Sequence, residues 1–285
     1  MSHLKLFGDY MALAKPRITL MVLATTGLGL YLAPSSLGLG STLGVLFGTT
    51  AIVAGANALN MYIEREIDGR AARTRKRPLS AGRLVPSEAL IFGVLMTLVA
   101  LPLLYLSSNL LTAGLGLLAS LLYVAVYTPM KQLSPGALVV GAVPGAIPPL
   151  MGWTAVTGRI DLVGVTLFAI LFMWQLPHFL AISLYRSTEY KQAGYKVTVT
   201  EHGIGTAKLQ IVLYLLALCP VTLLLVPLGL GGPIYLWTAL LCGVAFIALG
   251  LSGLRRAAGA RWARSLFVGS LFYLMTLAAA LVVGQ

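Results

Sequence analysis

Residues 89–107 read ALIFGVLMTLVALPLLYLS, and residues 110–128 read LLTAGLGLLASLLYVAVYT. Neither stretch contains a charged side chain, and only Ser108 and Asn109 separate the two. The hydrocarbon core of a bilayer is about 30 Å thick and takes roughly 20 apolar residues as a helix. The two stretches are therefore predicted to cross a membrane as a tight helical hairpin.

The same pattern recurs along the chain. Of its 285 residues, 58% are hydrophobic and 10% are charged, whereas a soluble domain carries about a quarter charged residues. This composition excludes a water-soluble fold and predicts an all-α, polytopic integral membrane protein. We expect one domain over residues 1–285, with about nine transmembrane helices in a single bundle around a central apolar cavity. The predicted spans are residues 17–33, 41–63, 89–107, 110–128, 137–156, 162–184, 209–228, 233–252 and 265–283.

Basic side chains are distributed unevenly between the predicted loops. If the spans alternate in direction, 19 of the 20 Lys and Arg residues lie on one side of the bilayer, and only Arg159 lies on the other. Basic residues favour the cytoplasmic side, so we expect a cytoplasmic N-terminus and an external C-terminus. The net charge of +12 then reflects cytoplasmic loops and anionic lipid headgroups, and we expect no nucleic-acid partner. Residues 1–16 are interpreted as a cytoplasmic lead-in, which favours a bacterial inner membrane.

The first functional loop is predicted at about residues 64–88, where the second span leaves the membrane. Asn60, Glu64 and Asp68 are spaced four residues apart, so they form one stripe on a helix, and Asn57 lies one turn earlier. Amide and carboxylate oxygens on one face suit Mg²⁺, which takes one or two protein carboxylates together with phosphate oxygens. We therefore predict that Asn60, Glu64 and Asp68 are catalytic residues that bind Mg²⁺.

A basic cluster follows this acidic stripe. Guanidinium and ammonium groups hold the oxygens of a phosphate, so stripe and cluster together indicate a metal-bridged diphosphate. The predicted diphosphate-binding residues are Arg73, Lys76, Arg77 and, from the next cytoplasmic loop, Lys131.

Two simpler interpretations of this loop stay open. In the first, neighbouring salt bridges neutralise the charges at the end of the helix. In the second, the Lys131 side chain only extends its ammonium group to the membrane surface and reflects the topology. The neighbouring salt bridges would join Glu64, Glu66 and Asp68 to Arg65, Arg70 and Arg73.

The second functional loop is predicted at about residues 185–208. His178 lies inside the sixth apolar span, one residue after Pro177, and an ionisable group at such a depth is a functional candidate. The alternative is a neutral imidazole that bonds to a neighbouring helix. Glu189 and Tyr190 are further candidates, and Glu189 is either a second metal ligand or a partner of Arg186.

Several of these segments resemble one known family. Asn60-x-x-x-Glu64-x-x-x-Asp68 resembles the first acidic motif, NxxxDxxxD, of the UbiA superfamily of intramembrane prenyltransferases, although Glu64 stands where many members have Asp. Residues 73–79 read RTRKRPL and are similar to the RTxxRPL stretch of one branch, the protoheme IX farnesyltransferases or haem O synthases. Three more segments agree in the family's order, at residues 13–17, 145–153 and 174–194.

The resemblance implies a single intramembrane prenyltransferase domain and a specific reaction. A farnesyl group is transferred from farnesyl diphosphate to a vinyl group of haem B, and water addition gives haem O and diphosphate. Mg²⁺ is the implied cofactor, held by Asn60, Glu64 and Asp68. His178 is then expected to bind or orient haem, and Asn57 is expected to share this role. The implied partners are the lipid bilayer and, downstream, a haem A synthase or oxidase assembly proteins.

Three other functions fit the sequence less well. Asp68-Gly-Arg-Ala-Ala-Arg73 matches the DGxxAR core of CDP-alcohol phosphotransferases, but the required acid three residues earlier is replaced by Arg65. A prenyltransferase for a quinone or chlorin ring is disfavoured by the RTxxRPL and WQxPHF stretches. A transporter is disfavoured because its charged groups are expected near the midplane, whereas here the carboxylates gather at one membrane edge.

Overall fold

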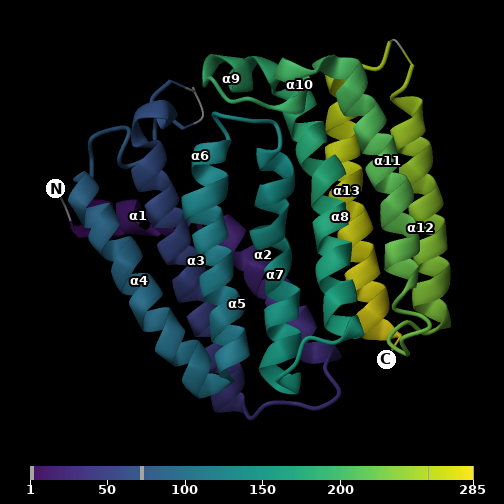
Figure 1. Cartoon of the computed structure of the whole chain (residues 1–285), viewed down its shortest axis with the longest axis horizontal. Helices are drawn as coiled ribbons and strands as arrows, with labels where there is room; N and C mark the ends of the chain where they lie inside the picture. Colours follow the sequence, from purple (N-terminus) through teal and green to yellow (C-terminus); the bar gives the residue numbers. More distant parts are fainter. Residues whose placement is uncertain (1–2, 71–73, 256, 285) are drawn as a thin grey trace. The chain divides into compact units, whose positions relative to one another are not determined.

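The computed structural model describes residues 3–70, 74–255 and 257–284, and every regular element in these ranges is a helix (Figure 1). The helices belong to two compact units, one within residues 1–133 and 143–160 and the other within residues 134–142 and 161–285. The first unit contains α1 (His3–Ala14), α2 (Pro16–Leu32), α3 (Leu39–Asp68), α4 (Pro86–Ser107), α5 (Leu110–Leu121), the π-helix η1 (Leu122–Tyr127) and α6 (Thr128–Met130). The second contains α8 (Leu162–Tyr185), α9 (Ser187–Gln192), α10 (Thr198–Glu201), α11 (Gly203–Leu223), α12 (Pro233–Ser252) and α13 (Ala260–Val283), and α7 (Ala137–Thr157) contributes to both units.

The all-α, polytopic membrane fold is confirmed. Among the described residues, eight helices are long and apolar enough to cross a bilayer. The first predicted span corresponds to α2, which is apolar but has only 17 residues. At 1.5 Å per residue this helix is about 25 Å long, slightly less than the hydrocarbon thickness. A single domain with a central cavity stays a prediction.

Close contact between α3 and α4 depends on glycine. A Cβ on Gly55 would lie 2.8 Å from both the Gly93 carbonyl oxygen and Thr97 Oγ1, and a Cβ on Gly93 would lie 2.7 Å from Leu59. Small residues let membrane helices approach closely enough for extensive van der Waals packing. The short connection at Ser108 then returns the chain into α5, as the predicted hairpin requires.

The fourth predicted span changes its winding before it ends. α5 passes into η1 and then into α6, which carries Pro129 in its first turn. In an α-helix the proline ring collides with the carbonyl four residues earlier, and a wider π turn removes that collision. Thr128 Oγ1 donates a 2.7 Å hydrogen bond to the Tyr123 carbonyl, which stabilises this turn.

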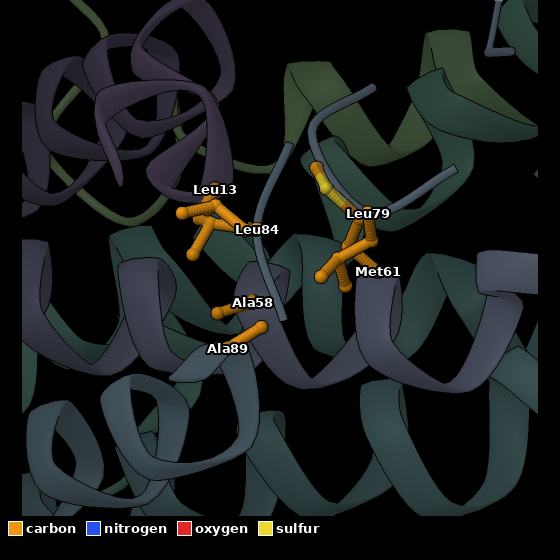
Figure 2. Close-up of a cluster of buried hydrophobic side chains, with 6 residues drawn as sticks. All are labelled: Leu13, Ala58, Met61, Leu79, Leu84 and Ala89. Carbon is orange, nitrogen blue, oxygen red and sulfur yellow. The ribbon is translucent and has the colours of Figure 1, made fainter. Parts of the chain in front are cut away.

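A small apolar cluster fastens α1 and the loop after α3 to the same part of the first unit (Figure 2). It buries side chains from α1, α3, the loop and the start of α4, namely Leu13, Ala58, Met61, Leu79, Leu84 and Ala89. Tyr10, Tyr62 and Phe92 pack around it. The cluster therefore determines where the residues just after Leu13 and just before Leu79 lie against α3.

The second unit is held together by α8, α11, α12 and α13. α8 packs against α11 and α13, and α12 packs against the same two helices. Polar bonds join the helices within this apolar unit: Trp174 Nε1 donates a 2.7 Å bond to the Ser270 carbonyl, and Tyr235 donates a 2.8 Å bond to the Thr222 carbonyl. Such bonds fix the register of helices that lipid cannot drive together by hydrophobicity.

Candidate active site

Three oxygen-bearing side chains lie along one buried face of α3. Asn60, Glu64 and Asp68 expose 1%, 3% and 1% of their surface, and the spacing of four residues keeps them in a narrow stripe. α3 continues to Asp68, beyond the end of the predicted span, so the stripe is helical up to its last carboxylate. Buried groups of this kind require polar partners from other segments.

Arg77 bridges the two carboxylates of the stripe. Its Nη1 lies 2.5 Å from Asp68 Oδ2 and 3.9 Å from Glu64 Oε2. Leu79 holds the same loop in the apolar cluster, and Thr74 Oγ1 donates a 2.7 Å hydrogen bond to the Asp68 carbonyl. The guanidinium is thereby fixed at the end of the stripe, where it compensates charges that would be costly to bury alone.

Lys131 reaches the middle of the stripe from the end of the fourth span. Its Nζ donates a 2.6 Å hydrogen bond to Glu64 Oε1 and lies 4.6 Å from the centre of the Tyr127 ring. Burial lowers the pKa of Lys131, but Tyr127 and Glu64 outweigh burial and raise this pKa above its usual range. The ammonium group is therefore charged at neutral pH, and the structure brings it into the site as predicted from its position in the loop.

Lys15, from the junction of α1 and α2, completes the set of cations. Its Nζ donates a 2.8 Å hydrogen bond to Asn60 Oδ1, and Asn60 Nδ2 donates a 2.9 Å bond to Thr128 Oγ1. Burial, followed by the charges of Arg77 and Lys131, lowers the pKa of Lys15 to about 7. Because the charges of Arg77 and Lys131 add to the effect of burial on Lys15, an anion between the three side chains would relieve part of their repulsion.

The site built in this way has more positive than negative charge. We refer to its members as the polar cluster, which consists of Lys15, Asn60, Glu64, Asp68, Arg77 and Lys131. Asp68 Oδ1 is fully buried and has no hydrogen-bond partner among the described residues, which is unusual for a carboxylate oxygen.

The donor set of the polar cluster fits magnesium. Two carboxylates and one amide oxygen are ligands that Mg²⁺ takes from proteins, while phosphate oxygens and water complete its coordination. The open Asp68 Oδ1 offers one such ligand without any change in the hydrogen bonds described above. Among the described residues, no group of three or more His, Cys, Asp or Glu side chains is arranged to hold a metal ion, and the polar cluster itself offers two carboxylates and one amide.

The other residues predicted in this loop have different environments. Arg73 lies outside the described residues. Lys76 is exposed, and its carbonyl accepts a 3.1 Å hydrogen bond from Arg83 Nη2. Of the neighbouring salt bridges considered as the simpler interpretation, Arg65–Glu66 is present at 3.6 Å on the surface. Among the described residues, the buried Asp68 pairs with Arg77, nine positions away, and the buried Glu64 pairs with Lys131, 67 positions away.

Asn57 contacts α1 rather than the polar cluster. Its Nδ2 donates a 3.3 Å hydrogen bond to the Ala14 carbonyl, and this bond places the residue that follows, Lys15, beside the stripe. A role of Asn57 in orienting haem stays a prediction.

His178 lies in the second unit, on the buried side of α8. Its Nδ1 is 2.6 Å from Ser270 Oγ on α13. The ring stacks on Trp174 with centroids 4.7 Å apart, and Phe267 lies at 4.8 Å. The predicted depth in an apolar span is therefore present, together with a bond to a neighbouring helix.

Glu189 and Tyr190 lie on the short helix α9 after α8. Glu189 Oε2 is 3.4 Å from Arg186 Nη1, which is the ion pair considered as one alternative in the sequence. The Tyr190 ring lies 6.0 Å from that of Tyr195. A second metal ion at Glu189 stays a prediction, and its pairing with Arg186 in a partly exposed ion pair does not favour it.

Sequence reasoning missed the two polar residues that reach Asn60 from other segments. In the sequence, Lys15 contributed only to the prediction of membrane orientation and to one of the segments that resemble the family. Thr128 had no predicted role. Lys15 has φ 48°, and it is the one non-glycine residue with positive φ among those described. The residue before a proline ordinarily avoids this region, so a lysine held there points to a functional constraint, but the sequence alone does not reveal the angle.

Residues 22–277 match the model of the UbiA prenyltransferase family. The chain belongs to this family. It is similar to the protoheme IX farnesyltransferase of Myxococcus xanthus (strain DK1622), with 49% sequence identity over 98% of this chain and 95% of the relative. The protoheme IX farnesyltransferase of Anaeromyxobacter sp. (strain Fw109-5) is 50% identical over 99% of this chain and 95% of the relative. The predicted resemblance is confirmed, and the UbiA family member described here is an enzyme of the prenyltransferase class.

Solved structures show the same fold at low sequence identity. A digeranylgeranylglyceryl phosphate synthase has a TM-score of 0.84 at 18% identity, with 98% of each chain covered. A UbiA homologue from Archaeoglobus fulgidus, solved with DMAPP and Mg²⁺, has a TM-score of 0.67 at 14% identity and covers 96% of this chain and 99% of its own. These similarities support the UbiA fold. They do not identify the substrates, which have to be inferred from the residues of this chain.

Proposed function

We propose that this UbiA prenyltransferase transfers the farnesyl group of farnesyl diphosphate to a vinyl group of haem B, and that the reaction requires Mg²⁺. The polar cluster supports both the diphosphate and the metal, because three cations surround its two carboxylates and the buried Asp68 Oδ1 has no hydrogen-bond partner among the described residues. Relatives at about half identity are protoheme IX farnesyltransferases, and this supports farnesyl and haem as donor and acceptor.

The C1–O bond of farnesyl diphosphate breaks, and its electron pair leaves with the diphosphate oxygen. The π electron pair of the vinyl group forms the new carbon–carbon bond to C1. Water adds to the resulting carbocation beside the porphyrin and releases a proton. Haem B, farnesyl diphosphate and water thus give haem O, diphosphate and a proton.

The polar cluster acts on the leaving group. Arg77, Lys131 and Lys15 hold the diphosphate oxygens and stabilise the negative charge that develops on them as the C1–O bond breaks. Asn60, Glu64 and Asp68 would hold Mg²⁺, which when bound supplies Lewis-acid stabilisation of the same leaving oxygens. Lys15 and Arg77 lie two residues from Leu13 and Leu79 of the apolar cluster, so the positions of these two cations depend on that cluster.

His178 is proposed to orient haem B, and Arg73 and Lys76 are proposed as further diphosphate contacts. The enzyme is proposed to lie in a bacterial inner membrane with its N-terminus and the polar cluster at the cytoplasmic side, as the loop charges favour. A haem A synthase or oxidase assembly proteins are proposed to take up the product.

The proposal is tested with membranes that contain the full chain. They are incubated with haem B, farnesyl diphosphate and Mg²⁺, and the haem fraction is analysed by mass spectrometry. We expect a farnesylated, hydrated haem that disappears when Mg²⁺ is removed with a chelator. An Asp68→Asn variant should insert normally and lose turnover. A folded preparation that leaves haem B unmodified but prenylates a quinone ring would overturn the assignment of the acceptor.

A further inference from the structure

A second polar group, unlike the polar cluster, lies between α8 and α13 in the second unit. It consists of His178 and Ser270, surrounded by the rings of Trp174 and Phe267. His178 exposes 8% of its surface and Ser270 exposes none. No charged side chain is bonded to either residue in the described parts of the chain, so the protons within this pair are governed by hydrogen bonding alone.

The position of each proton follows from the hydrogen bonds of Ser270. A serine hydroxyl has a single proton to donate. Ser270 Oγ donates it to the Phe267 carbonyl of its own helix, at 2.6 Å. The 2.6 Å contact between Ser270 Oγ and His178 Nδ1 therefore has the imidazole as donor. In a neutral imidazole this places the proton of His178 on Nδ1 and leaves the lone pair on Nε2.

The surroundings of Nε2 differ from those of Nδ1. No hydrogen bond joins Nε2 to another described residue. Nε2 is also not fully enclosed, since the enclosed side-chain atoms without a partner among the described residues are Thr49 Oγ1, Asp68 Oδ1 and Trp153 Nε1. Its lone pair is consequently available to a ligand. Trp174, Phe179 and Phe267 lie around the imidazole at centroid distances of 4.7, 5.6 and 4.8 Å, an environment suited to a flat aromatic molecule.

We propose that Ser270 is a positioning residue, which keeps His178 in the Nδ1–H tautomer so that Nε2 ligates the iron of the haem acceptor. This inference rests on the proposed function. A histidine that binds a metal commonly donates its other N–H to a neighbouring oxygen, which fixes the ring and makes the ligand more basic. Ser270 supplies that oxygen from a different helix. The acceptor is then recognised through its iron as well as through its ring.

The test uses the full-length protein in lipid nanodiscs and two probes, haem B and metal-free protoporphyrin IX. Affinity is measured by absorbance titration, and the iron–histidine stretching band of the ferrous complex is measured by resonance Raman spectroscopy. The variants are His178→Ala, Ser270→Ala and Ser270→Thr. Ser183→Ala is the matched control, because Ser183 is also buried and donates a 2.8 Å bond to the Leu180 carbonyl of its own helix, and no hydrogen bond joins it to a histidine among the described residues.

We expect His178→Ala to lose the iron–histidine band and to regain a ligated spectrum when imidazole is added. Ser270→Ala should weaken haem binding about tenfold and lower the stretching frequency. Ser270→Thr should restore both, and Ser183→Ala should change neither. Binding of metal-free protoporphyrin IX should be the same in all variants, which separates loss of ligation from loss of folding.

Two results would overturn the inference. One is that the wild-type protein binds haem B and makes product, while the His178→Ala variant keeps the same iron–histidine Raman band. The other is a Ser270→Ala protein that loses stability and protoporphyrin binding together, which indicates a purely structural hydrogen bond. A wild-type protein that neither binds haem B nor farnesylates it would instead refute the proposed function.

Discussion

Arg77 is the residue on which the two carboxylates of the site depend. It lies 2.5 Å from Asp68 and 3.9 Å from Glu64. Replacing it with Gln leaves buried negative charge uncompensated and removes a cation from the departing diphosphate. We expect Arg77→Gln to lower kcat by about 100-fold or more, measured as haem O formed per minute. Arg83→Gln is the matched control, because Arg83 lies in the same loop but pairs with Asp9 at 2.9 Å. Equal rates for the two variants would contradict the assigned role.

The backbone at Lys15 allows its charge to be tested separately from its conformation. Lys15 has φ 48°, a region that asparagine adopts more readily than most residues. Lys15→Asn should therefore keep the junction of α1 and α2 while removing the ammonium group. We expect the KM for farnesyl diphosphate to rise about tenfold, which corresponds to about 1.4 kcal/mol of lost binding, with little change in Tm. A large fall in Tm with an unchanged KM would show that the lysine acts on the fold.

At the scale of elements, the α3–α4 pair determines where the stripe lies. A Cβ on Gly55 would be 2.8 Å from the Gly93 carbonyl oxygen, so Gly55→Val must push the helices apart. Such overpacking costs about 1–3 kcal/mol, and we expect a lower Tm in detergent, measured by circular dichroism. Gly114→Ala on α5 is the control, because a Cβ there meets nothing within 4 Å. An unchanged Tm for Gly55→Val would show that this contact is not tight in solution.

The elements were predictable because membrane spans depend on local composition. Eight predicted spans coincide with helices, and the hairpin at Ser108 follows directly from the lack of residues to form a longer connection. The ends were less predictable: α3 continues to Asp68 because buried partners from other segments stabilise polar residues beyond the apolar run. η1 was not expected, since its cause is the interplay of Pro129 with the turn before it.

The site was only partly predictable, for a physical reason. The stripe on α3 follows from helical periodicity, and Arg77 and Lys131 follow from charge in loops at the same face. The bond from Lys15 to Asn60 joins residues 45 positions apart and depends on how α1 folds back, which no local pattern encodes. The depth of His178 follows from its place in an apolar span, whereas its partner Ser270 lies 92 positions away and could not be predicted from a local pattern.

At the scale of the whole molecule, the uneven charge predicts how the chain enters the membrane. If the predicted spans alternate in direction, 19 of the 20 basic residues lie on one side, and the N-terminus should then be cytoplasmic and the C-terminus external. We expect a green fluorescent protein fused at the N-terminus to fluoresce in a bacterial host, and an alkaline phosphatase fused at the C-terminus to be active. The controls carry the two reporters at the opposite termini. Fluorescence of a green fluorescent protein fused at the C-terminus would reverse the predicted orientation.

The ion pairs of Glu64 with Lys131 and of Asp68 with Arg77 also determine how the two ligands influence each other's affinity. A diphosphate that takes over the cations releases the carboxylates for a metal, and a metal that takes over the carboxylates releases the cations. Binding of each ligand therefore favours binding of the other, and thermodynamic reciprocity makes the two enhancements equal. Isothermal titration should find weak binding of Mg²⁺ or inorganic pyrophosphate alone and each affinity raised by the same factor, about 5- to 150-fold, when the other is present. Independent binding would mean that the resting ion pairs survive in the occupied site.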